Sequence, residues 1–265
     1  MAANNLGETT KVVMGRKPAQ KDDPTPPVAY GAKKWVKGDD GVWESKALVG
    51  QAKKKYAIKG EKSGEWIVAH ILNSKSLPTR DEIVGMMRQA DTLQAKWPLT
   101  HRPELVIGDF TAKKVTGRGT AGFTYSGTIQ GAKRELIMVG GFNVNSHDIP
   151  VGNHVIFINS NPANIINNTL KASAGFLSPA YVNTNGWDYT VAHEYGHLRN
   201  WQGADKNVFY TVGDVIQKVG PPISRYGKSS RVEAHAEGFA EWAHSGGRTI
   251  DAFSRELAKT YDWPT

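Results

Sequence analysis

Two histidines and a glutamate in one short segment have the spacing of a metal centre that could carry out hydrolysis. His193 and His197 are four residues apart in the segment Ala-His-Glu-Tyr-Gly-His-Leu, which begins at residue 192. Side chains four residues apart lie on one face of an α-helix, so both imidazoles could reach one ion. The carboxylate of Glu194 would lie beside them, where it could accept a proton from water. This H-E-x-x-H pattern is typical of zinc peptidases and predicts a zinc site with Glu194 as general base.

A catalytic zinc site needs a third protein ligand, and the residues leave several candidates open. The chain has no cysteine, which excludes thiolate zinc sites, iron–sulfur clusters and cysteine nucleophiles. The metzincin pattern is also excluded, because Asn200 and Gly203 stand where that class has a glycine and a third histidine. The remaining candidates are downstream acids and one histidine: Asp205, Asp214, Glu233, His235, Glu237 and Glu241.

Three of these carboxylates recur along one face of a predicted alanine-rich helix at residues 229–244. Glu233, Glu237 and Glu241 follow one another at intervals of four residues, so they would repel one another unless a cation lay nearby. The helix also carries small side chains that would let it pack closely, namely Ala234, Ala236 and Ala240. Ser230 and Glu233 fit a capping box as well, and Glu241 is interpreted as a solvated acid.

Three motifs follow one another in the last third of the chain. They are the H-E-x-x-H segment, Ser-Arg-Tyr-Gly from residue 224, and Glu-Ala-His-Ala-Glu-Gly-Phe from residue 233. Together they resemble the peptidase domain of anthrax-lethal-factor-like gluzincins, a zincin-like class that also occurs in bacteriophage-encoded proteins. The resemblance implies one Zn²⁺ per chain with Glu233 as the third ligand, and a Tyr226 hydroxyl directed at the developing oxyanion. It also implies that Glu237 accepts a hydrogen bond from a ligand histidine. His235 departs from the family, which tends to have a bulky apolar residue there, and is interpreted as half-buried.

The elements that must position these residues are predicted from hydrophobic periodicity. A helix should begin after Thr79, with Asp81 and Glu82 in its first turn, and should end before Pro98. Strand patterns follow at 104–108, 122–129, 135–139 and 154–158, and helical patterns at 162–173, 187–201, 205–218, 229–244 and 249–260. One helix, a small mixed sheet and several helices predict an α+β, zincin-like metallopeptidase domain over residues 79–265. Substrate could pair with the backbone of 154–158 or 178–186.

Residues 1–78 differ in composition from the rest of the chain. Residues 1–29 are polar and are predicted to form an extended arm. Residues 30–78 repeat an aromatic strand, a Gly-rich turn and a tryptophan strand, which predicts a small basic β-hairpin-rich module. Four aromatic side chains would form the apolar face of its sheet: Trp35, Trp43, Tyr56 and Trp66. Residues 1–78 carry 14 Lys/Arg against 8 Asp/Glu, whereas residues 79–265 carry 19 against 17. Contact of the basic module with nucleic acid is a less favoured alternative to a solvated, lysine-rich surface.

The remaining features bear on location and on the class of function. No apolar stretch comes near the roughly 18 residues that a membrane span needs, and the N-terminus lacks the pattern of a signal peptide. We therefore expect synthesis in the cytoplasm, with association with a virion as an option. The favoured function is a zinc-dependent endopeptidase acting on a protein or peptide, and peptidoglycan peptides would require the same chemistry. The alternative is a structural head or tail protein of a phage, assembled with other virion proteins through its arm. The other histidines lack metal-ligand spacing and are given no role: His70, His101, His147, His154 and His244.

Overall fold

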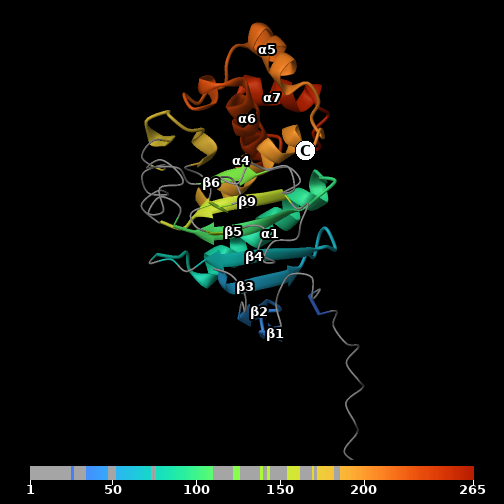
Figure 1. The fold of residues 1–265 in the computed structure, drawn as a ribbon. Helices are drawn as coiled ribbons and strands as arrows, with labels where there is room; N and C mark the ends of the chain where they lie inside the picture. Colours follow the sequence, from blue (N-terminus) through green and yellow to red (C-terminus); the bar gives the residue numbers. More distant parts are fainter. Residues whose placement is uncertain are drawn as a thin grey trace, which may run out of the picture.

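A seven-stranded mixed sheet runs through the protein, and most of the helices gather at one end of it (Figure 1). The computed structural model describes residues 25–26, 34–46, 52–72, 74, 76–109, 122–125, 138–139, 142–143, 154–161, 169, 172–181 and 186–265. Within these residues the architecture is mixed α and β, as the sequence predicted.

The strands of the large sheet follow the order β1-β2-β3-β4-β5-β9-β6. Their bounds are β1 Val36–Lys37, β2 Trp43–Lys46, β3 Ala52–Lys59, β4 Trp66–Leu72, β5 Pro103–Gly108, β9 His154–Asn159 and β6 Gly122–Tyr125. A separate antiparallel pair is formed by β7 Met138–Val139 and β8 Phe142–Asn143. The predicted strands at 104–108 and 154–158 are confirmed. Only parts of those predicted at 122–129 and 135–139 lie among the described residues.

The centre of the sheet is parallel, and its two flanks are antiparallel. Strand β4 pairs in parallel with β5, and β5 pairs in parallel with β9. Every residue of β4 and β5 is buried, as are residues 155–159 of β9. Parallel strands covered on both faces need such continuous apolar runs, which explains segments such as Trp-Ile-Val-Ala-His-Ile-Leu in β4.

The two predicted hairpins are confirmed, but they do not form a separate module. Strands β1 and β2 pair antiparallel, as do β3 and β4. However, β4 also pairs with β5, so one sheet extends across the boundary predicted between residues 78 and 79. The division into domains 30–78 and 79–265 is therefore wrong. The reason is that β4 is a buried central strand rather than the edge of a small sheet. The arm predicted at 1–29 lies almost entirely outside the described residues.

The aromatic residues of the hairpins divide between the two faces of the sheet. Trp35 and Trp43 pack with Trp66 in a small cluster on one face. Tyr56 instead belongs to the main hydrophobic core, so its predicted place on the same face is wrong. The register explains this, because Ala57 is the residue opposite Trp43, and neighbours along a strand point to opposite faces.

Five α-helices complete the described fold: α1 Arg80–Lys96, α4 Gly186–Trp201, α5 Val208–Val219, α6 Arg231–Ser245 and α7 Ala252–Thr260. They confirm the helices predicted from Thr79 and at 187–201, 205–218, 229–244 and 249–260. The start of α1 is the predicted one, since Thr79 and Glu82 form a capping box. The helix predicted at 162–173 lies largely outside the described residues. No described helix is long and apolar enough to cross a membrane.

In their described residues, neither segment predicted to align a substrate forms an outer strand of the sheet. Residues 154–158 belong to β9, which lies between β5 and β6. Residues Pro179–Tyr181 form a 3₁₀ turn, η3, and Gly186 already begins α4. Among the described strands, the outermost on this side of the sheet is β6, which lies next to α4 (Figure 1).

Candidate metal centre

Helix α4 carries the H-E-x-x-H residues in a stretch, residues 189–199, that is buried on all sides. His193, Glu194 and His197 are all buried. The helix is fixed to α1 by Tyr195, whose hydroxyl lies 2.8 Å from Gln94 Oε1 and 2.9 Å from the carbonyl oxygen of Trp97. Tyr195, which lies between Glu194 and His197 in the sequence, thus fixes α4 against α1. The two histidines point in another direction and can reach a metal ion.

Three side chains from two helices converge on one point. His193 Nε2 lies 3.1 Å from Glu233 Oε2 and 3.2 Å from His197 Nε2. The third side of the triangle, from His197 Nε2 to Glu233 Oε2, is 3.3 Å. In the part of the chain that the structure describes, these three residues are the group that could hold a metal ion.

The helices α4 and α6 approach closely because small residues face each other. A Cβ atom placed on Gly196 would lie 2.9 Å from Ala236 Cα and 3.3 Å from both Ala236 O and Phe239 Cβ. The predicted close packing of the alanine-rich helix is thus confirmed at Ala236. The need for glycine at position 196 was not predicted from the sequence, because the spacing of the motif does not show that α6 packs against this residue.

Glu237 lies beside the first histidine, one helical turn beyond Glu233. Its Oε1 is 3.2 Å from His193 Nδ1, and its Oε2 accepts a hydrogen bond of 3.2 Å from the backbone N–H of Ser178. Burial alone would lower the pKa of His193, but contact with Glu233 and Glu237 raises it well above the ordinary value. Glu233 contacts both His193 and His197, and these contacts hold the pKa of Glu233 well below its usual range despite burial. These carboxylates therefore favour the protonated form of His193.

Tyr226 lies over the centre, from the loop that precedes α6. Its ring centroid is 5.8 Å from that of His193, with the two planes tilted by 38°. Burial, together with the charges of Glu233 and Glu194, raises the pKa of Tyr226 above its ordinary value. The hydroxyl is therefore protonated at neutral pH and can donate a hydrogen bond.

Two further aromatic rings pack against residues of the centre. Phe176 is 6.1 Å from Tyr226, and Trp201 is stacked at 6.0 Å from His197, measured between ring centroids. These two outer side chains are 39% and 47% exposed. Two partly exposed aromatic rings thus lie close to the centre.

Asp205 and His235, two other candidate ligands, form a separate buried network with each other. Asp205 accepts hydrogen bonds from Arg199 Nε at 2.8 Å, Arg199 Nη2 at 2.6 Å and Trp263 Nε1 at 3.2 Å. Its Oδ2 lies 2.9 Å from His235 Nε2. Burial would raise the pKa of Asp205, but His235 and Arg199 lower it to about 2. His235 is fully buried, so its interpretation as half-buried is wrong.

The remaining candidates lie apart from the three ligand atoms. Asp214 is exposed on α5. Glu241 is only 5% exposed, and its carboxylate accepts hydrogen bonds from the hydroxyls of Ser178 and Thr249. Its interpretation as a solvated acid is therefore wrong, because residues 172–181 and the segment after α6 cover this end of the helix. Of the histidines given no role, His147 lies outside the described residues, and the others are not part of the metal group.

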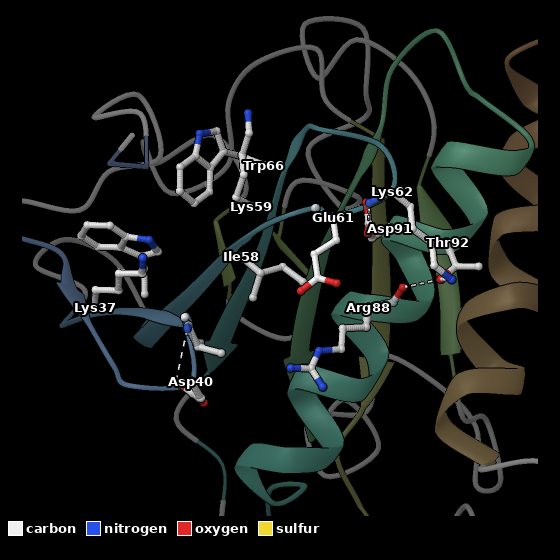
Figure 2. A pocket seen from close by; sticks show the side chains of 14 residues that line it. Lys37, Asp40, Ile58, Lys59, Glu61, Lys62, Trp66, Arg88, Asp91 and Thr92 are labelled. Atoms are coloured by element: carbon white, nitrogen blue, oxygen red, sulfur yellow. Dashed lines mark hydrogen bonds between the residues drawn. The ribbon is translucent and has the colours of Figure 1, made fainter. Parts of the chain in front are cut away.

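A cavity of about 540 Å³ lies between the hairpins and α1 (Figure 2). Four cationic and three carboxylate side chains line it: Lys37, Lys59, Lys62, Arg88, Asp40, Glu61 and Asp91. Asp91 accepts hydrogen bonds from the backbone N–H groups of Lys62 and Ser63, and Asp40 forms an ion pair with Arg80. Figure 2 shows Glu61 and Arg88 extending into the same space. Because its charges nearly balance, the cavity lacks the strongly cationic surface of a nucleic-acid site, and we assign it no ligand.

The structure thus brings together His193, His197 and Glu233, with Glu194, Tyr226 and Glu237 around them. No family model, no curated protein and no solved structure matches the chain. The functional assignment therefore depends on the geometry of the centre.

Proposed function

We propose that the protein is a zinc-dependent endopeptidase whose C-terminal helices form a zincin-like, gluzincin-type centre. The observation that carries this proposal is the triangle of ligand atoms from α4 and α6, with sides of 3.1, 3.2 and 3.3 Å. Two ligands at about 2.0–2.1 Å from a tetrahedral zinc ion are about 3.3–3.4 Å apart. The three side chains therefore need to move by only a few tenths of an ångström to hold zinc.

The chemistry of the ligand set also fits zinc. Two imidazoles and one carboxylate are a known catalytic set for this ion, and they leave a fourth position for water or substrate. When bound, the ion supplies positive charge that polarises a carbonyl group and makes a water molecule more acidic. Glu237 would orient His193 from behind through the Nδ1 atom, which strengthens a histidine ligand.

Glu194 is assigned as the general base. It is buried beside His193 and adds negative charge to the surroundings of that histidine. As water attacks the peptide carbonyl, Glu194 takes one proton from it. When the C–N bond breaks, Glu194 passes this proton to the departing amine, so the carboxylate is regenerated.

Tyr226 is assigned as the donor to the oxyanion. Its raised pKa keeps the hydroxyl protonated, and its ring contact with His193 places it at the ligand face. A donor that bonds more strongly to the developing oxyanion than to the carbonyl lowers the barrier, typically by about 2.7–4 kcal/mol. The substrate backbone would lie along β6, the outermost described strand next to α4, and pair with its main-chain groups.

The test is cleavage of a mixed peptide library by zinc-loaded protein and by zinc-loaded Glu194→Gln. We expect the wild type to cleave and the variant to bind one zinc ion yet remain inactive. Glu61→Gln, which changes an exposed glutamate outside the centre, is the matched control and should retain full activity. Equal cleavage by wild type and Glu194→Gln would refute the role of Glu194. A wild type that holds stoichiometric zinc but cleaves nothing in the library would refute the peptidase assignment.

A further inference from the structure

A short segment between β9 and α4 connects the two sides of the centre. Residues 172–181 pass between α6 and the loop that carries Tyr226. Phe176 accepts a hydrogen bond of 2.8 Å from the N–H of Tyr226, and Gly175 accepts one of 3.2 Å from the N–H of Arg225. Two residues further on, the N–H of Ser178 donates to Glu237. The same few residues therefore contact both the tyrosine and the carboxylate that supports His193.

Ser178 is itself fixed by a buried carboxylate. Its hydroxyl donates to Glu241 Oε2 and accepts a hydrogen bond of 3.1 Å from the N–H of Ala180. The other oxygen of Glu241 accepts a hydrogen bond of 2.7 Å from Thr249. Ser178 and Glu241 are 2% and 5% exposed. Burying a carboxylate is costly unless hydrogen bonds satisfy it, so the position of the Ser178 hydroxyl is strongly constrained.

The three glutamates along α6 thus make three different kinds of contact. Glu233 supplies a ligand atom, Glu237 contacts a ligand histidine, and Glu241 holds the segment that contacts Glu237. Displacement of Ser178 would release one oxygen of Glu237 and would also shift the backbone that holds Tyr226. Loss of the Glu241 carboxylate should therefore displace both His193, through Glu237, and Tyr226.

We propose that Ser178 and Glu241 are positioning residues that hold Glu237 against His193 and Tyr226 over the centre. The inference rests on the proposed function for Tyr226, but its effect on the ligands can be measured without catalysis. Neither side chain touches the three ligand atoms, so both act through Glu237 and through residues 175–178.

The test compares Ser178→Ala and Glu241→Gln with a matched control, Ser160→Ala. Ser160 is also fully buried, and its hydroxyl donates to the carbonyl oxygen of Ser76, which is not part of the centre. Cobalt(II) is used as the probe, because its visible spectrum and its dissociation constant report on the ligand set. Removing a partner of a ligand histidine typically weakens metal binding about 10–100-fold. We expect about tenfold weaker cobalt binding and a changed spectrum in both variants, and no change in the control.

The readouts separate this inference from a purely structural role and from the peptidase assignment. If both variants bind cobalt like Ser160→Ala and differ only in melting temperature, the inference is overturned. If cobalt binding weakens as expected while even the wild type cleaves no peptide, the positioning role stands and the proposed function fails. Where cleavage is measurable, Ser178→Ala should lower kcat with little change in KM, because Tyr226 acts on the transition state.

Discussion

The close approach of α4 and α6 at Gly196 makes the substitution Gly196→Ala a sharp test of how the centre is built. A Cβ atom there would meet Ala236 Cα at 2.9 Å, whereas carbon atoms in contact prefer about 3.5–4.0 Å. The obstacle is backbone, so it cannot rotate away, and the helices would have to separate by about 0.6–1.1 Å. Glu233 lies on α6 less than one turn from Ala236 and would move with that helix.

The expected magnitudes follow from two opposing effects. Overpacking of a core typically costs about 1–3 kcal/mol, and replacing a helical glycine by alanine returns up to about 1 kcal/mol. We therefore expect the metal-free variant to lose up to about 2 kcal/mol of stability. A separation of the helices by this amount would pull Glu233 away from the two histidines. We therefore expect zinc affinity to fall at least about tenfold, which corresponds to about 1.4 kcal/mol.

The assay is a zinc titration against a chromophoric chelator, combined with thermal unfolding of the metal-free protein. Gly85→Ala is the matched control, because Gly85 also lies in a helix and a Cβ there would meet only Asp188 Oδ1 at an ordinary 3.8 Å. The control should melt at a higher temperature and bind zinc as the wild type does. If Gly196→Ala behaves like this control in both measurements, the close contact of α4 with α6 does not position the three side chains.

Four further outcomes are expected. Tyr226→Phe should lower kcat about 100–1,000-fold with zinc affinity unchanged, and an unchanged kcat in steady-state assays would exclude the oxyanion role. Zinc should bind more tightly as the pH rises from about 6 to about 8, because the raised pKa of His193 means that zinc must displace a proton; a constant affinity in pH-dependent titrations would contradict this. Asp205→Asn should lower the free energy of unfolding in urea by about 3 kcal/mol, since Arg199 would be left buried without its partner. Because the pKa of Asp205 is lowered on folding, its ionised form stabilises the folded state by about 2 kcal/mol at neutral pH. This stabilisation is lost as the pH falls from about 4 to about 2. The acid unfolding of the variant should therefore lack the loss of stability in that range. A chain that begins at residue 79 should fail to fold, because it lacks β4; cooperative melting of that fragment by circular dichroism would show otherwise.

The parts of the centre that could be predicted from sequence are those fixed by one helix at a time. The four-residue spacing of His193 and His197 puts both on one face whatever surrounds them, and the spacing of the acids does the same for Glu233 and Glu237. The structure places all four together. Even the start of α1 could be predicted, because a capping box is a contact between residues three apart.

The parts that could not be predicted depend on which elements meet. Glu241 looked like a surface acid because its own helix says nothing about the segment that covers it. His235 and Asp205 were both plausible ligands, and only the packing of α6 against the loop after α4 shows that they pair with each other. The false domain boundary has the same origin, because the parallel pairing of β4 with β5 joins strands on either side of α1.

The parallel centre of the sheet also bears on the order in which the protein folds. The hairpins and α1 join residues that are close in sequence, whereas Pro103 of β5 pairs with His154 of β9. Contacts between such distant residues form slowly, because a long loop must close before they gain any stabilisation. Helix α4 packs against β9 and β6, so its ligands come into place only after that loop has closed. The ability to take up a metal ion should therefore appear late in refolding, after most of the secondary structure has formed.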